Sequence, residues 1–291
     1  MIVPVPLTNE PSADFVPSVL VAPSHWREID FISDLHLKDD EPATFAAWQS
    51  FMQNTPADAV FILGDFFEVW VGDDLINDPA HSKYESEERR GIAEPTFEKR
   101  CVEVLKNASE RLDIFFLHGN RDFLLSSAFE KASGSKHLDD PSCLEFAGER
   151  WLLSHGDALC LGDTDYLVFR DQVRSADWQQ NFLAKPLKER QAIARSIRAQ
   201  SESRKQSGLS YADVDAAEAT RWLTAHKAST LIHGHTHRPA DHQLISQQPQ
   251  PLPPTNTLRR MVLSDWDAAA TPPRAEILRL GVNHPPIRIK A

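Results

Sequence analysis

Cysteine is scarce in this chain of 291 residues, which has three, at positions 101, 143 and 160. They are widely spaced and form no CxxC pair, so the sequence excludes a disulfide framework and offers no structural thiolate site for zinc. Each cysteine is expected to be a small buried side chain. A reducing compartment, the cytosol, follows as the expected location.

Positive charge is also in short supply, with 31 Lys and Arg against 42 Asp and Glu and a net charge of −11. Wholesale binding of nucleic acid needs a basic footprint, so no nucleic-acid partner is expected. No apolar run approaches the ~20 residues that cross a bilayer. The first 26 residues lack a basic segment and contain five prolines, so they do not resemble a secretory signal. Residues 1–27 are predicted to form a flexible N-terminal arm, and residues 28–291 one domain with an elaboration.

Five short apolar runs each end in a polar cluster. They lie at 29–33, 59–63, 114–117, 151–153 and 230–232. Their length fits buried strands, and the segments 43–54 and 93–111 between them fit helices, so the chain is predicted to be an α/β protein. Further strand-like runs lie at 242–246, 260–264 and 275–280, with the proline-rich loop SQQPQPLPPTN between the first two. In α/β sheets, sites assemble at the carboxyl ends of the strands, which is where the polar clusters fall.

Residues 164–227 form a helical stretch without strand signals. Between 164 and 210 it has nine Lys and Arg against five Asp and Glu. Apolar side chains such as Trp178, Phe182 and Ile193 recur at helical spacing, which predicts amphipathic helices with basic faces. Two interpretations stay open: a solvated elaboration packed on the domain, and a surface that binds an anionic membrane.

The five strand ends carry ligand-type side chains: Asp34, His36, Asp65, Asn120, His155, His235 and His237. Read alone, the stretch LIHGHTHRP at 231–239 could equally be a solvated turn. Together, carboxylates, imidazoles and one amide suit divalent ions such as Mn, Fe or Zn. A carboxylate can bridge two such ions, and a pair of ions supports phosphoryl transfer to water.

The motifs DLH, GD, GNRD, HGD and GHTH, in this order, resemble those of the calcineurin-like metallophosphoesterase superfamily over residues 29–239. That resemblance implies a four-layered α/β/β/α sandwich with a helical insertion, or lid, at about 164–227. It also implies two metal ions that share Asp65. One would take Asp34, His36, Asp65 and His237, and the other Asp65, Asn120, His155 and His235. His233 lies outside the pattern and is expected to form local hydrogen bonds.

One position departs from the superfamily. Most members have a histidine after the Gly-Asn pair that protonates the leaving group, whereas this chain has Arg121. An arginine stays charged at neutral pH, but its planar fork can hold phosphate oxygens in two bonds. A phosphate leaves as a stable anion and needs no proton donor, so the site suits a pyrophosphate bond.

The longer stretches FISDLHL, GDFFEVWVGDD, GNRDFLL, HGDALC, DYLVFR and IHGHTHRP are similar to the UDP-2,3-diacylglucosamine pyrophosphatase family of bacterial lipid A synthesis. The resemblance implies manganese-dependent hydrolysis of UDP-2,3-diacylglucosamine to lipid X and UMP by a peripheral protein on the cytoplasmic side of the inner membrane. It assigns Asp65, Asn120 and Arg121 to catalysis. The substrate contacts it implies are Asn120, Arg121, Asp163, Ser201, Lys205 and His235. The family has Asn and Lys where this chain has Lys205 and Gly208, so the sequence departs from the family pattern at these two positions.

Two other functions remain open. A metallophosphoesterase that acts on another nucleotide diphosphate or phosphodiester would share every metal ligand. A non-catalytic interaction module with a vestigial metal site would be expected to lose ligands, and none is missing.

Overall fold

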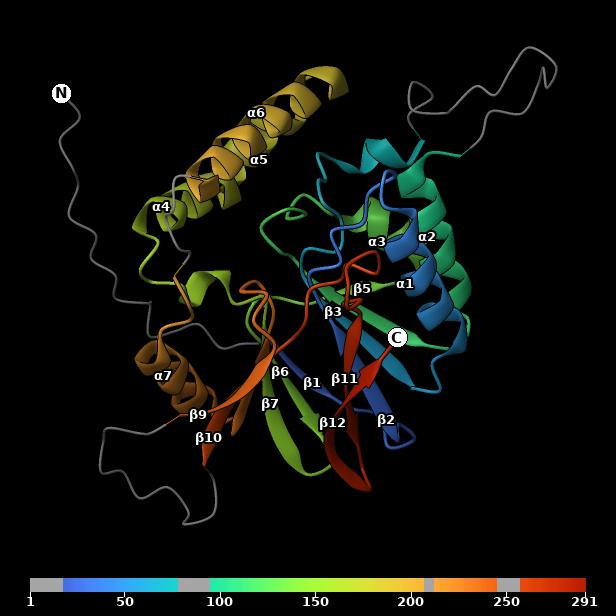
Figure 1. Cartoon of the computed structure of the whole chain (residues 1–291), viewed down its shortest axis with the longest axis vertical. Coiled ribbons are helices and arrows are strands. Elements are labelled where there is room, and N and C mark those ends of the chain that lie inside the picture. The colour runs from blue at the N-terminus through green and yellow to red at the C-terminus, as the bar shows by residue number, and fades with distance from the viewer. Residues whose placement is uncertain (1–17, 78–94, 207–211, 245–256) are drawn as a thin grey trace.

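The computed structural model describes residues 18–77, 95–206, 212–244 and 257–291, and the side chains of 200–206 are not included in the description. Its strands form two six-stranded sheets (Figure 1). The first sheet has the order β1 (Ser18–Val21), β6 (Ser142–Phe146), β7 (Glu149–Ser154), β8 (Thr230–His233), β10 (Leu258–Val262), β9 (Ala240–Leu244). The second has the order β12 (His284–Lys290), β11 (Glu276–Gly281), β2 (Glu28–Ile32), β3 (Ala59–Leu63), β4 (Asp113–Leu117), β5 (Lys136–His137).

Helices cover the outer face of each sheet. The second sheet is covered by α1 (Pro42–Asn54), α2 (Phe97–Ala108) and α3 (Ser127–Ser133), and the first by α7 (Ala216–His226). One apolar cluster lies under the helices of each sheet, and a separate apolar cluster lies between the two sheets, which pack face to face. The fold is therefore the predicted α/β/β/α sandwich.

Strand β3 shows why the central strands are apolar along their whole length. All five of its residues are buried, because successive side chains point to opposite faces and both faces are covered. Phe61 lies between the sheets, where its ring stacks on Phe31 and Phe115 at centroid distances of 5.1 and 4.8 Å. Ile62 points the other way, into the cluster that contains Trp48 of α1.

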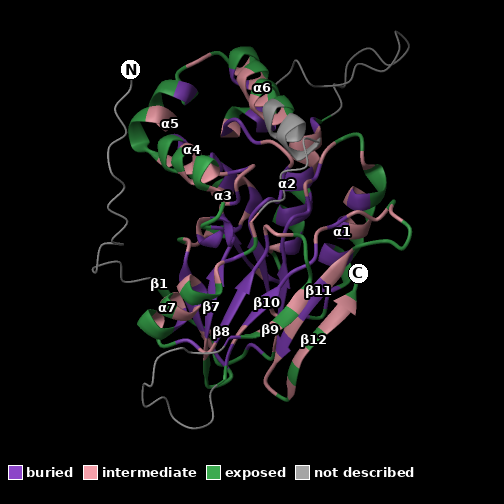
Figure 2. Cartoon of the chain, turned by 60° about the vertical axis from the view of Figure 1, so that its left-hand side comes forward, coloured by how far each residue is buried: buried purple, intermediate pink, exposed green. Residues whose placement is uncertain are grey.

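Three helices project beyond the sandwich: α4 (Thr164–Arg174), α5 (Ala176–Leu183) and α6 (Leu187–Gln206) (Figure 1). Figure 2 shows that their described residues are mainly exposed or half-buried, unlike the strands beneath them. Their apolar residues Trp178, Phe182 and Ile193 join the cluster that covers the second sheet. Helix α7 is different, because Ala219 and Leu223 are fully buried against the first sheet. The projecting insertion is thus shorter than the expected 164–227, since its last helix is an outer layer of the sandwich.

The predicted N-terminal arm is also shorter than expected. Residues 18–21 form β1, which pairs in parallel with β6, and Trp26 is 2% exposed. The prediction was wrong for 18–27 because a four-residue edge strand carries too little pattern to stand out among prolines. The rest of that segment, 1–17, is outside the described residues.

Other boundaries moved by a few residues. The runs expected at 242–246, 260–264 and 275–280 correspond to β9, β10 and β11, while the proline-rich loop at 246–256 is not among the described residues. Strands β5, β6 and β12 were not predicted. Strand β12 includes Pro285 and Pro286, which an edge strand tolerates because one side of its backbone has no partner. All three cysteines are free and buried, as expected.

Candidate metal centre

The seven predicted ligands come together where the two sheets meet. Asp34 and His36 follow β2, Asp65 follows β3 and Asn120 follows β4, all from the second sheet. His155 follows β7, and His235 and His237 follow β8, from the first sheet. Strands β2, β3 and β4 are parallel, as are β7 and β8, so their carboxyl ends deliver these side chains to one region.

The first group of atoms surrounds the end of β2. His237 Nε2 lies 3.3 Å from Asp34 Oδ1 and 3.2 Å from His36 Nε2. His36 Nε2 is in turn 3.8 Å from Asp65 Oδ2. Asp34, His36 and His237 satisfy the geometry of a metal-binding group.

The second group uses the other oxygen of Asp65. His155 Nε2 lies 3.7 Å from Asp65 Oδ1 and 3.1 Å from Asn120 Oδ1, and His235 Nδ1 lies 3.0 Å from the same amide oxygen. Asp65, His155 and Asp34 form a second metal-competent group. Asp65 therefore presents one carboxylate oxygen to each group, while Asp34 is close to both.

The backbone at this centre is held in an uncommon conformation. Asp34, His36, Asp65, His235 and His237 all have positive φ, between 48° and 65°. Non-glycine residues adopt this region rarely and at a cost of about 1–2 kcal/mol each. Such strain clusters at functional sites, where the surrounding structure imposes it.

Two motif glycines leave room for the carboxylates. A Cβ at Gly119 would lie 2.1 Å from Asp65 Oδ1, and one at Gly234 would lie 2.2 Å from Asp34 Oδ2. Neither distance is compatible with a side chain, so glycine at these positions is needed for close approach of the backbone.

Polar contacts on the far side of two rings, a hydrogen bond for His155 and an ion-pair contact for His36, direct the Nε2 atoms inward. His155 Nδ1 donates to the carbonyl of Leu63 at 2.8 Å, and His36 Nδ1 lies 2.8 Å from Glu68 Oε2. The Nε2 atom of each ring is then available as a ligand.

The centre is electrostatically suited to a cation. Asp34 Oδ1 is buried and accepts no hydrogen bond from any residue that the structure describes. Burial would lower the pKa of His155, but the carboxylates of Asp65 and Asp34 outweigh it and raise that pKa to about 9. Burial, assisted by the charge of His155, lowers the pKa of His235 to about 4. The side chains thus fit divalent ions, which would satisfy the buried Asp34 oxygen that accepts no hydrogen bond and the converging lone pairs.

His233, the remaining histidine of LIHGHTHRP, is buried but outside this centre. Its Nδ1 donates to the carbonyl of Gly234 at 2.9 Å, and its Nε2 lies 3.5 Å from Arg260. The expectation of local hydrogen bonds is confirmed.

The residues predicted to contact substrate do not all lie at the metal centre. The backbone amide of Arg121 donates to Asp65 Oδ1 at 2.9 Å, and its guanidinium is 3.9 Å from Glu68. Asp163 is the N-cap of α4 and accepts from the amide of Tyr166 at 3.2 Å. Ser201 and Lys205 belong to α6, but their side chains are outside the description, as is all of Gly208.

Several residues near the centre were missed from the sequence. Asp157, two positions after His155, is fully buried and accepts from Tyr166 Oη at 2.6 Å and Arg170 Nε at 2.8 Å. The Tyr166 ring stacks on His235 at 5.9 Å. Glu68 was also missed. The sequence feature that could have identified it is an acidic residue within the otherwise apolar stretch FFEVWV.

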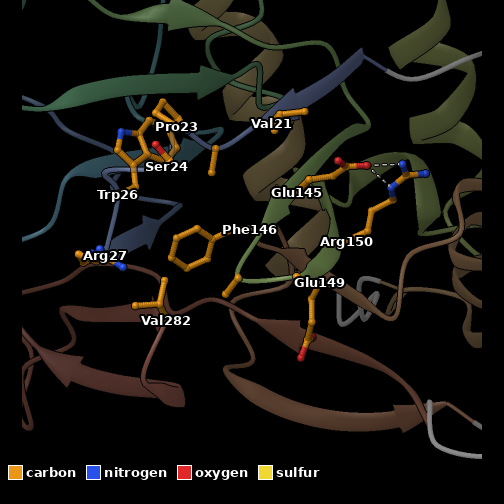
Figure 3. A pocket seen from close by; sticks show the side chains of 13 residues that line it. Val21, Pro23, Ser24, Trp26, Arg27, Glu145, Phe146, Glu149, Arg150 and Val282 are labelled. Atoms are coloured by element: carbon orange, nitrogen blue, oxygen red, sulfur yellow. Dashed lines mark hydrogen bonds and ion pairs between the residues drawn. The ribbon is translucent and has the colours of Figure 1, made fainter.

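A hollow of about 510 Å³ lies away from this centre (Figure 3). It is lined by residues that include Trp26, Arg27 and Phe146, just before β2 and at the turn between β6 and β7. Those are the amino end of β2 and the hairpin end of β7, whereas the ligands follow the carboxyl ends of the same strands.

Comparison with known proteins agrees with this geometry. Residues 28–239 match the family model for calcineurin-like phosphoesterases, so the chain belongs to that family. It is 47% identical to the UDP-2,3-diacylglucosamine hydrolase of Chromobacterium violaceum over 223 residues, which cover 74% of this chain and 84% of the relative. It is 39% identical to the protein of the same name from Escherichia coli O81 over 240 residues, or 81% of this chain and 90% of the relative. The Cellvibrio japonicus protein of that name is 39% identical over 83% of this chain and 95% of its own length. In the part of the chain that the structure describes, no helix is long and apolar enough to cross a membrane.

Proposed function

We propose that the protein hydrolyses the pyrophosphate bond of UDP-2,3-diacylglucosamine to give 2,3-diacylglucosamine 1-phosphate and UMP. The observation that carries this is the pair of ligand groups sharing Asp65, in a chain whose relatives bear the name of that activity.

Two Mn²⁺ ions per chain are proposed for the centre. Asp34, His36, Asp65 and His237 would hold the first, and Asp65, Asn120, His155 and His235 the second. When bound, the ions supply charge neutralisation of the phosphoryl group and activation of water.

Arg121 and Asn120 would act on the substrate from the loop after β4. The arginine replaces the usual histidine, so it would hold phosphate oxygens through its fork and would not donate a proton. Its position is supported by the bond from its own amide to Asp65 and by the nearby Glu68. A phosphate leaving group is consistent with a site that has no acid at this position.

The projecting helices would cover the substrate. Asp163, Ser201 and Lys205 are proposed to contact it, together with His235. Tyr166 supports this arrangement, because its ring lies over His235 at the foot of α4.

Association with an anionic membrane, on the cytoplasmic side of the inner membrane, is part of the same proposal. Much of the positive charge of the insertion is directed inward, in the bonds Arg170 to Asp157, Arg174 to Gly119, Arg190 to Asp74 and Arg198 to Glu68. Lys188 and Arg195 remain exposed, as do the apolar side chains Val168 and Leu183. Exposed cations beside exposed apolar side chains are typical of a surface that binds a membrane interface, but fewer cations are exposed than the sequence suggests.

The test is hydrolysis of UDP-2,3-diacylglucosamine by metal-stripped protein with Mn²⁺ added back, beside soluble UDP-sugars. Asp65→Ala should abolish turnover together with metal binding, whereas Arg121→Ala should lower turnover by roughly 10²-fold or more with metal retained. Preference for soluble UDP-sugars would favour the alternative substrate class. Metal binding without any hydrolysis would favour a non-catalytic module. Full Mn²⁺-dependent activity in Asp65→Ala would refute the shared ligand.

A further inference from the structure

Glu68 connects the candidate metal centre to the projecting helices. Its side chain is 13% exposed, and its two oxygens face different partners. Oε2 lies 2.8 Å from His36 Nδ1, and Oε1 lies 2.5 Å from the guanidinium of Arg198 on α6. Arg121 approaches the same Oε1 at 3.9 Å. One carboxylate thus joins the loop after β2, the loop after β4 and the longest helix of the insertion.

The carboxylate is charged in this setting. Its oxygens face the ring of His36 at 2.8 Å and the guanidinium groups of Arg198 and Arg121 at 2.5 and 3.9 Å. A buried anion is stable only when its oxygens are paired, so each partner depends on the others to keep the group satisfied.

We propose that Glu68 is a positioning residue that couples metal occupancy at His36 to the placement of α6. This rests on the proposed function in one respect, that a cation binds at His36 Nε2. A cation there fixes the ring and makes Nδ1–H a stronger donor, which fixes Oε2 of Glu68. Since both oxygens belong to one planar group, Oε1 is then held for Arg198. By thermodynamic linkage, ordering of α6 must strengthen metal binding to the same extent.

A second contact of α6 serves as an internal control. Arg190, eight residues before Arg198, is 3% exposed and donates to the carbonyl of Val71 and to Asp74. This contact holds α6 on the loop after β3. Within the described residues, Asp74 forms no hydrogen bond or ion pair with the predicted ligands, so Asp74→Asn should loosen the helix without a direct effect on the metal centre.

The experiment measures Mn²⁺ affinity by calorimetry and amide hydrogen exchange across residues 187–199, in the full chain and without substrate. In the wild type, Mn²⁺ should slow exchange in this part of α6. Glu68→Gln should weaken Mn²⁺ binding by roughly 10–100-fold, the usual effect of losing an outer-shell partner of a ligating histidine. It should also abolish the Mn²⁺-dependent slowing of exchange.

Control variants separate positioning from general damage. Arg198→Gln should lose the Mn²⁺-dependent protection while its Mn²⁺ affinity falls only a few-fold, and it tests the coupling even where Glu68→Gln folds poorly. Asp74→Asn should raise exchange in α6 with and without Mn²⁺ and still show the Mn²⁺-dependent decrease. Unchanged Mn²⁺ affinity in Glu68→Gln, or a wild type that binds Mn²⁺ without a change in α6, overturns the proposal. A wild type that binds no Mn²⁺ overturns the proposed function itself.

Discussion

Asp157 and Arg170 form an ion pair beneath the projecting helices, in which Arg170 Nε donates to Asp157 Oδ2 at 2.8 Å. The carboxylate is completely buried, and the same oxygen accepts from Tyr166. Asp157 follows the predicted ligand His155 by two residues, and Arg170 is on α4. The first helix of the insertion is therefore bonded directly to the turn that carries the predicted ligand His155.

Removal of this carboxylate should destabilise the protein strongly. Asp157→Ala leaves the guanidinium of Arg170 and the hydroxyl of Tyr166 without their buried acceptor, and loss of one member of a buried pair costs about 3–5 kcal/mol. We expect the free energy of unfolding in urea to fall by about that amount.

Glu145→Ala is the matched control for Asp157→Ala. Glu145 pairs with Arg150 far from the ligands, and both side chains are about a third exposed. An exposed pair contributes about 1 kcal/mol or less. Equal losses in the two variants would show that the Asp157 pair has no special role.

Gly119→Ala should disturb the metal centre through sterics alone. Its backbone φ is not in the left-handed region, but the added Cβ would lie 2.1 Å from Asp65 Oδ1. We expect Asp65 to be displaced and Mn²⁺ affinity, measured by calorimetry, to fall by roughly 10-fold or more.

Gly148→Ala supplies the comparison for Gly119→Ala. Gly148 has a φ of +78°, and an added Cβ would meet nothing within 4 Å. It should lose about 1 kcal/mol of stability through backbone strain and keep the Mn²⁺ affinity of the wild type. A metal affinity lowered to the same degree in both variants would contradict the steric explanation.

The convergence of the predicted ligands could be anticipated because their positions follow from local pattern. An apolar run that ends in Gly-Asp or Gly-Asn marks a buried strand and its carboxyl end, and parallel pairing then brings Asp65 and Asn120 together. Glu68 and Arg198 were not predictable in this way, since their contact joins positions 130 residues apart through the docking of α6. Strand β1 was missed for a similar reason, because its pairing with β6 is long-range and its own pattern is only four residues long.

Divalent metal should stabilise the folded chain. The unfolded chain cannot bring these side chains together, so binding adds about 2.7 kcal/mol per site at a free metal concentration 100 times the dissociation constant. We expect Mn²⁺ to raise the unfolding midpoint in urea and a chelator to reverse the change. Asp65→Ala should gain much less, because its carboxylate faces both ligand groups. An equal gain in that variant would place the metal elsewhere.

His235 and His237 should each be needed to bind a different ion. His237 lies against Asp34 and His36, whereas His235 lies against Asn120, which also contacts His155. Each of His235→Ala and His237→Ala should therefore lower the Mn²⁺ content from two ions per chain to about one, measured by elemental analysis after reconstitution and desalting. His233→Asn is the control, because its amide can replace the ring in donating to the carbonyl of Gly234 and should leave the metal content unchanged. If both variants kept two ions, or if His233→Asn lost one, the division of the histidines between two ions would have to be abandoned.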